Sequence, residues 1–206
     1  MIAIVDYDAG NLLSVKKALD FLGVENIVTR RRDELFRADK IILPGVGAFG
    51  KAMDNIKKYE LDQVLLEITQ KQIPLLGICL GLHLLFSGSE ESSGVEGLNL
   101  LEGDIRRIPD HLSLKVPHIG WNQLHMKKDT LLYQGLPEQV YAYFVHSYYL
   151  QAADTSIVSA TADYGVTIHA SVEKDSIFAC QFHPEKSSNA GLAMLKNFAG
   201  EGVASC

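Results

Sequence analysis

The first half of the chain alternates short aliphatic runs with amphipathic stretches. The aliphatic runs lie at residues 2–7, 25–30, 40–45 and 73–79. Between the first two runs, apolar residues recur every three or four positions, as on one face of a helix, and Gly23 then stops the pattern. These apolar residues are Leu12, Val15, Leu19 and Leu22. A second helical region is expected at about 49–70. This alternation predicts a parallel sheet with helices on both faces.

The second half of the chain has a different pattern, in which strand-like runs follow one another with turn residues between them. The runs lie at residues 101–108, 121–126, 140–150, 156–165, 166–173 and 176–183. Such a succession favours antiparallel hairpins, and a last helix is expected at about 189–198. We therefore predict an α/β fold, a three-layer sandwich with a mixed, mostly parallel central sheet, helices on both faces and antiparallel hairpins in the second half.

Composition narrows the class of protein. The chain has 206 residues with no repeat or low-complexity linker, so we expect a single domain over residues 1–206. A net charge of −6 argues against nucleic acid as a partner. No apolar run approaches the roughly 20 residues that span a bilayer, so we expect no membrane association and a soluble, cytoplasmic protein.

Three cysteines occur at unrelated spacings, Cys79, Cys180 and Cys206. An odd number with this spacing fits neither a disulfide framework nor a metal site. We expect a reducing compartment, no metal and no cofactor.

The segment GICLG at residues 77–81 places Cys79 between two glycines where a strand gives way to a helix. Gly-x-nucleophile-x-Gly is how several enzymes hold a reactive side chain above a parallel sheet, because small neighbours permit a sharp turn and the start of the helix favours the thiolate. A small cysteine buried in an apolar strand is the alternative interpretation of this segment alone.

The segment QFHPEKS at residues 181–187 offers a base for the thiol. His183 and Glu185 are two positions apart at the end of a strand-like run, so the carboxylate can orient the imidazole and stabilise its cation. Seen alone, the segment also fits an ordinary His-Pro turn with an exposed glutamate. The sequence distance from Cys79 is no objection, because such pairs form in space.

The segment PGVGAFG at residues 44–50 follows the strand-like run 40–45 and exposes backbone N–H groups. The turn of Gly45, Val46 and Gly47, together with the N–H of Leu80, is our candidate for an anion hole. The same glycines form a G-x-G-x-x-G pattern, but a dinucleotide site is disfavoured, because a proline opens the turn and a lone glycine pattern is weak.

Taken together, these segments resemble the class I (triad) glutamine amidotransferases, essentially from end to end. GICLG and HPE are typical of the wider amidotransferase superfamily. The segments YDAGNLLSV (7–15), PHIGWN (117–122) and YFVHSYY (143–149) are similar to the subfamily of glutaminase subunits of imidazole glycerol phosphate synthases, which belong to histidine biosynthesis.

The resemblance implies a role for each matching residue. Cys79 would be the nucleophile, His183 the general base and acid, and Glu185 its orienting partner. The anion hole would be formed by Gly45, Val46, Gly47 and Leu80, and the glutamine would be held by Glu91, by the backbone of Ser147 and Tyr148 and by the residue at position 83. The loop 87–97, which contains Glu91, is expected to be exposed and to rim the site.

Position 83 departs from the family, which has glutamine where this chain has His83. An imidazole is shorter and becomes charged near its ordinary pKa, so we expect weaker or pH-sensitive glutamine binding. The alternative is a histidine that packs near the site without touching the substrate.

The resemblance also implies a partner, a (β/α)8-barrel cyclase subunit that receives the ammonia in a stable heterodimer. Interface residues carried over are Trp121, Tyr143 and Lys186; a core tryptophan, a strand aromatic and a solvated lysine are the alternatives. The subfamily suggests that the isolated subunit is nearly inactive until the partner and its ligand reorient the PGVG turn. The run Arg30–Arg32 is interpreted as the solvated start of a helix and receives no function.

Three other functions stay open on the sequence. A similar subunit can supply ammonia to a paralogous barrel for sugar amination. The chain can instead be a non-catalytic scaffold subunit, or a cysteine peptidase or hydrolase of the same sheet architecture, which acts on peptides without a partner.

Overall fold

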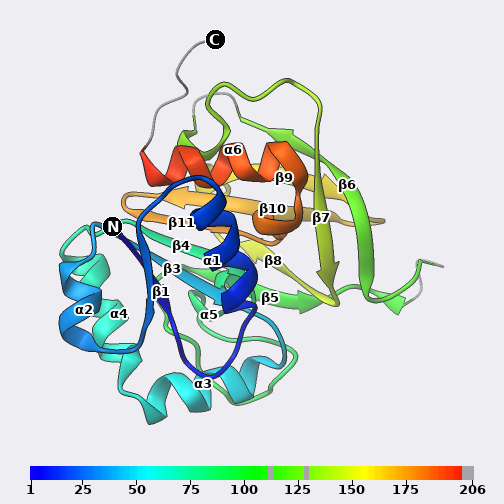
Figure 1. Cartoon of the computed structure of the whole chain (residues 1–206). Coiled ribbons are helices and arrows are strands. Elements are labelled where there is room, and N and C mark those ends of the chain that lie inside the picture. Colours follow the sequence, from blue (N-terminus) through cyan, green and yellow to red (C-terminus); the bar gives the residue numbers. More distant parts are fainter. Residues whose placement is uncertain (111–113, 128–129, 201–206) are drawn as a thin grey trace.

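A nine-stranded mixed sheet forms the centre of the computed structural model, which describes residues 1–110, 114–127 and 130–200 (Figure 1). The strand order is β2-β1-β3-β4-β11-β10-β9-β6-β7. The bounds are β1 Ile2–Val5, β2 Asn26–Thr29, β3 Lys40–Gly45, β4 Leu75–Cys79, β6 His118–Met126, β7 Val140–His146, β9 Val158–Asp163, β10 Thr167–Lys174 and β11 Ile177–Cys180. A separate two-stranded sheet pairs β5 (Gly103–Arg107) with β8 (Tyr148–Ala152).

The parallel half of the central sheet brings the candidate segments to one edge. Strands β2, β1, β3, β4 and β11 run parallel. Gly45 at the end of β3 is the register partner of Cys79 at the end of β4, and Cys180 at the end of β11 pairs with Ile78. The carboxyl ends of parallel strands are where α/β proteins place ligands, so this edge is the expected location of a site.

The other half of the sheet is antiparallel, as the pattern of the second half predicts. Strands β10, β9, β6 and β7 continue the sheet through antiparallel pairs. The run expected at 101–108 forms β5, which pairs with β8 outside the central sheet.

Helices cover both faces, which confirms the three-layer arrangement (Figure 1). On one face, α1 (Leu12–Phe21) and α6 (Ser188–Ala199) pack on alternate residues of the parallel strands, including Ile4 and Ile42. On the other face, α2, α3, α4 and α5 pack on the intervening residues, including Val5 and Leu43. Their bounds are α2 Arg32–Arg37, α3 Phe49–Lys58, α4 Leu61–Gln70 and α5 Leu80–Leu84. Residues of one strand thus serve two cores because their side chains alternate between faces.

The helical region expected at 49–70 consists of two helices rather than one. The chain turns at Glu60, which has a left-handed backbone with φ of 56° and separates α3 from α4. No glycine or proline marks this break in the sequence, and left-handed conformations are rare for residues with a side chain. The sequence therefore gives no signal for the break. Within the described residues, no helix has the length and apolar character needed to cross a bilayer.

Candidate active site

Cys79 occupies a strained turn between β4 and α5. Its backbone has φ of 55° and ψ of −108°, which is unusual for a residue with a side chain. The neighbouring glycines permit this turn, because a Cβ on Gly81 would lie 1.9 Å from the Leu43 carbonyl oxygen and one on Gly77 would lie 2.9 Å from the backbone of Gly81. The GICLG segment is therefore shaped for close backbone packing around the thiol.

His183 and Glu185 lie in and beside a short 3-10 turn, Pro184–Lys186, that follows β11. Nδ1 of His183 lies 2.8 Å from Oε1 of Glu185, and both side chains are 1% exposed. Asn11 Nδ2 donates to the same carboxylate oxygen at 3.3 Å. The carboxylate thus holds the imidazole by Nδ1 and leaves Nε2, which is buried and makes no hydrogen bond to the described groups, for the thiol.

The charge environment of His183 favours its protonated form. Burial alone lowers the pKa of His183, but the Cys79 thiolate and the Glu185 carboxylate favour the imidazolium, and together they raise the pKa to about 9. His183 therefore carries both ring protons near neutral pH. The imidazolium has a proton to give to a leaving group, in the same cavity as the sulfur of the candidate nucleophile.

A cavity of about 420 Å³ opens over Cys79 and His183, within the usual range of about 300–1,000 Å³ for ligand pockets. Most residues that the sequence proposes for substrate and anion binding line it. They are Val46, Gly47, Leu80, His83, Glu91, Ser147 and Tyr148, with Lys186 also on the wall. A hollow of about 560 Å³ along the 87–95 loop contains neither Cys79 nor a histidine, so the smaller cavity is the candidate active site.

The candidate anion-hole turn is fixed from behind by a tyrosine that the sequence analysis missed. Tyr7 is fully buried and donates a 2.7 Å hydrogen bond to the Pro44 carbonyl. A Cβ on Gly45 would lie 2.6 Å from the Tyr7 hydroxyl, and Gly47 has a positive φ of 100°. Burial raises the pKa of Tyr7, so the hydroxyl keeps its proton and stays a donor.

Glu91, in the loop 87–97, lies on the cavity wall and contacts the first residue of α3. The N–H of Phe49 donates to its Oε2 at 2.9 Å, which fixes the carboxylate in place. Of the loop 87–97, which is expected to rim the site, Glu91 lines this cavity, whereas most of the other residues line the separate hollow. A carboxylate at this position can attract the ammonium group of an amino acid.

The structure changes the expectation for His83. The side chain is 5% exposed, and its Nε2 lies 2.8 Å from Oε1 of Gln181, which the sequence analysis missed. Burial lowers the pKa of His83 to about 4. The ring therefore stays neutral near pH 6.5, and the pH-sensitive binding expected from the ordinary pKa of histidine does not follow.

Two further buried histidines, His118 and His146, lie at the cavity wall or beside it. They fall within the segments PHIGWN and YFVHSYY, but the sequence predicts no role for them. His146 lines the cavity and lies 2.9 Å from His118, and its Nδ1 donates to the Tyr148 carbonyl at 2.9 Å. Burial lowers the pKa of His146 to about 3 and that of His118 to about 4. The neutral His146 ring therefore holds the Tyr148 backbone, which is one of the positions proposed to hold glutamine, and His118 holds the His146 ring.

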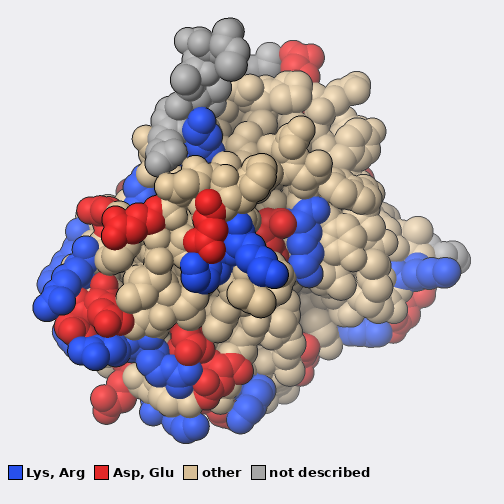
Figure 2. Space-filling view, in the orientation of Figure 1, with Lys and Arg blue, Asp and Glu red and all other residues tan. Residues whose placement is uncertain are grey.

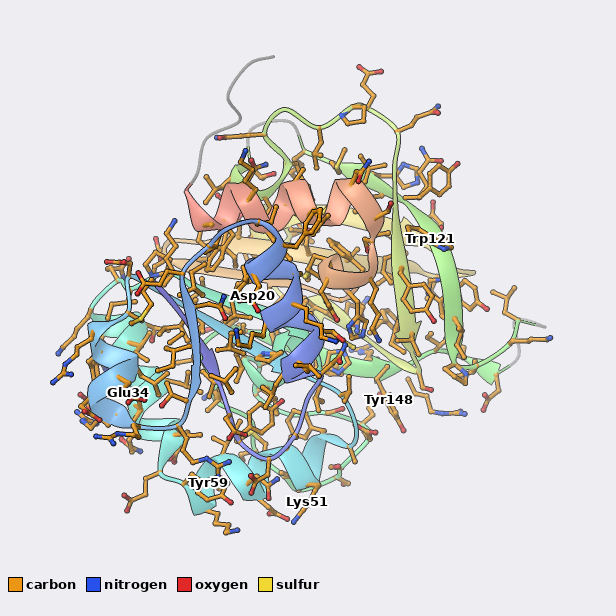
Figure 3. The ribbon with its side chains drawn as sticks, viewed as in Figure 1. Asp20, Glu34, Lys51, Tyr59, Trp121 and Tyr148 are labelled. Carbon is orange, nitrogen blue, oxygen red and sulfur yellow. The ribbon has the colours of Figure 1, made fainter. Side chains whose placement is uncertain are left out.

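The residues proposed for a partner interface lie on or near the outer hairpin. Trp121 is 54% exposed and meets Tyr143 edge-on across β6 and β7, with ring centroids 6.2 Å apart. Figure 3 shows Trp121 on β6, on the side of the molecule away from α2. Trp121 is therefore not a core residue, and Lys186 is exposed at the cavity mouth.

Arg30 differs from the solvated residue that the sequence analysis describes. It makes ion pairs of 2.6 Å with Asp6 and Asp8 and stacks over Tyr59, 4.1 Å from the ring centroid. It therefore anchors the loop between β1 and α1. Arg31 and Arg32 are exposed at the start of α2, as expected.

Comparison with known proteins gives concordant matches over almost the whole chain. The model of the family described as glutamine amidotransferase class-I matches residues 3–201. The chain is 48% identical over 200 residues to "Imidazole glycerol phosphate synthase subunit HisH" of Bacillus cereus (strain G9842), covering 97% of this chain and 94% of the relative. It is 49% identical over 197 residues to the subunit of the same name from Moorella thermoacetica, covering 96% and 93%.

Solved structures share the fold at low sequence identity. A structure described as a glutamine amidotransferase superposes with a TM-score of 0.75 at 19% identity, covering 97% of this chain and 100% of the other. The structure of PurLQS from Thermotoga maritima gives a TM-score of 0.76 at 17% identity, covering 97% of both chains.

Proposed function

Because the chain belongs to the class I glutamine amidotransferases, we propose that it is the glutaminase subunit of an imidazole glycerol phosphate synthase. It hydrolyses glutamine to glutamate and ammonia. The observation that carries this proposal is the strained Cys79 beside the His183–Glu185 pair in one cavity, in a chain 48% identical to subunits of that synthase.

The first half of the reaction forms a thioester. The Cys79 thiolate attacks the side-chain amide carbon of glutamine, and the carbonyl oxygen takes the negative charge. His183 then gives its proton to the amide nitrogen, and the C–N bond breaks. Ammonia leaves, and a γ-glutamyl thioester remains on Cys79. Glu185 keeps the ring in position through Nδ1 and stabilises its cation, so the Nε2 atom faces the reacting groups.

The second half of the reaction restores the thiol. His183, now neutral, removes a proton from water, and the resulting oxygen nucleophile attacks the thioester carbon. Cys79 leaves as thiolate and glutamate is released. His183 is protonated again, so the thiolate-imidazolium pair is ready for the next glutamine.

The anion in both halves is held by backbone donors. The N–H of Leu80 directly follows the nucleophile, and the turn of Gly45, Val46 and Gly47 lies at the end of the neighbouring strand, where Gly45 pairs with Cys79. Glu91 and the backbone of Ser147 and Tyr148 position the amino-acid end of glutamine. All of these residues except Gly45 line the cavity.

The ammonia passes to a (β/α)8-barrel cyclase subunit bound at the β6–β7 hairpin. The hairpin exposes three large apolar side chains, Ile119 at 61%, Trp121 at 54% and Tyr141 at 51%. Exposed apolar and aromatic residues of this kind are typical of protein interfaces. Figure 2 shows few charged side chains over this side and a mixture of charges over α2 to α4.

The partner also activates the site. In the isolated chain the turn of Gly45, Val46 and Gly47 favours an orientation whose N–H groups do not face the anion, and the barrel with its nucleotide ligand favours the competent one. Such a population shift needs only a few kcal/mol, on the order of a ligand's differential affinity. The positive φ of Gly47 makes peptide reorientation inexpensive at this point.

The test is to mix the purified chain with a cyclase subunit and measure glutamine-dependent ring closure together with glutamate release. We expect both activities in the mixture, little glutaminase in the isolated chain, and neither activity with Cys79→Ser. Glutamate release by Cys79→Ser at the wild-type rate would contradict the proposal. Glutamine-dependent amination of a sugar with a paralogous barrel, without ring closure in the cyclase mixture, would assign the glutaminase to a different synthase.

A further inference from the structure

Two side chains without a role in the hydrolysis scheme connect to the Cys79 sulfur through hydrogen bonds. Gln181 is fully buried, at 0% exposure, and its Nε2 donates to Cys79 Sγ at 3.9 Å. Its Oε1 lies 2.8 Å from Nε2 of His83. The connection joins the end of β4, the helix α5 and the residue after β11.

The chemistry of the sulfur determines which end of the Gln181 amide faces it. A thiolate accepts hydrogen bonds and cannot donate them, so the amide nitrogen faces Cys79 and the amide oxygen faces His83. His83 must then carry its proton on Nε2. Because burial lowers the pKa of His83 to about 4, the ring carries a single proton near neutral pH, and that proton fixes the amide.

We infer that Gln181 is a positioning residue that stabilises the Cys79 thiolate, and that His83 orients the Gln181 amide instead of holding the substrate. A hydrogen bond to a charged acceptor is stronger than one to a neutral acceptor, so the donor favours the thiolate over the thiol. This inference rests on the proposed function, because it concerns the same nucleophile.

The inference and the family expectation for position 83 differ in what a substitution changes. A residue that holds glutamine acts on the KM for glutamine and leaves the free thiol unchanged. A residue that acts through Gln181 changes the free thiolate, and in the assembled enzyme it lowers kcat more than it raises KM. The free chain and the assembled enzyme therefore give independent readouts.

The first experiment follows thiolate formation by ultraviolet absorbance during a pH titration of the full chain, with Cys79→Ser as the baseline. Gln181→Leu removes the amide and keeps a side chain of similar size. We expect the titration to move up by about one pH unit, the tenfold effect typical of losing a hydrogen bond to a charged group. The substitution leaves the titratable groups around the sulfur in place, namely Tyr7, His83, Cys180, His183 and Glu185.

The second experiment leaves Gln181 in place and compares two amides at position 83. In His83→Gln the amide nitrogen lies at the same position along the side chain as Nε2 of histidine, so it can still donate to Oε1 of Gln181. In His83→Asn the amide ends one bond earlier, near the Nδ1 position, and cannot reach it. We expect the titration to stay in place for His83→Gln and to move up for His83→Asn.

The results separate the inference from the proposed function. A titration that does not move in Gln181→Leu, or that moves equally in both His83 variants, overturns the inference while glutamine hydrolysis by the wild-type complex still supports the proposed function. A KM for glutamine that rises in His83→Asn without a change in the titration assigns His83 to the substrate and also overturns it. If Gln181→Leu does not fold, the His83 pair decides.

Discussion

Replacing Tyr7 by phenylalanine tests how the anion-hole turn is held. The hydroxyl is fully buried and donates to the Pro44 carbonyl at 2.7 Å, so Tyr7→Phe leaves that carbonyl without its buried donor. Leaving a buried polar group without a partner costs about 1–3 kcal/mol. For a domain of this size, about 2 kcal/mol lowers Tm by about 4–8 °C. Because Pro44 precedes the turn, we also expect a lower kcat in the assembled enzyme.

The assay combines urea unfolding of the free chain with glutaminase kinetics of the complex. Tyr133→Phe is the matched control, since this buried hydroxyl bonds Ser171 in the core and does not contact the turn. It should lower the free energy of unfolding and leave kcat unchanged. The reasoning would be refuted if the urea midpoint of Tyr7→Phe equalled that of the wild type. It would also be refuted if the variant lost stability without any change in kcat.

Three further predictions give independent tests. The pKa of His183 rises from 6.5 to about 9 on folding. The stability that its imidazolium confers is therefore fully present below about pH 6.5 and is lost as the pH rises through about 9. Urea unfolding of His183→Gln should show a smaller loss of stability over that window than the wild type, and an equal loss would contradict this. Gly81→Ala should fail to fold, because its Cβ would lie 1.9 Å from the Leu43 carbonyl oxygen. In the control Gly94→Ala the new Cβ meets no atom within 4 Å, so only the positive φ should cost stability, about 1–3 kcal/mol. Equal expression and melting of both variants would contradict the packing argument. Trp121→Ala should weaken binding of the cyclase by about 2 kcal/mol or more in calorimetry and leave Tm unchanged, because the side chain is 54% exposed; unaltered affinity would remove it from the interface.

The layered sheet was predictable because the signals that specify it are local. Aliphatic runs, amphipathic spacing and the stop at Gly23 are read within windows of a few residues. GICLG predicts a tight turn for the same reason, since only glycine tolerates the backbone contacts of Gly77 and Gly81. Once both strands are parallel neighbours, their carboxyl ends lie at the same edge of the sheet, where Gly45 pairs with Cys79.

The supporting contacts of the site could not be predicted, because they join residues far apart in the chain. Tyr7 meets Pro44, and Gln181 meets both Cys79 and His83, only after the strands assemble. Nothing near these residues in the sequence indicates their partners. The ordinary pKa of histidine also misled the interpretation of His83, because burial depends on the assembled core.

The most direct test of the central claim is mass spectrometry of the complex, quenched in acid while it turns over glutamine. The mechanism predicts a γ-glutamyl thioester on the peptide that contains Cys79, and loss of both the adduct and glutamate release in Cys79→Ser. Glutamate release that continues in Cys79→Ser, or an adduct on another side chain in the wild type, would contradict it.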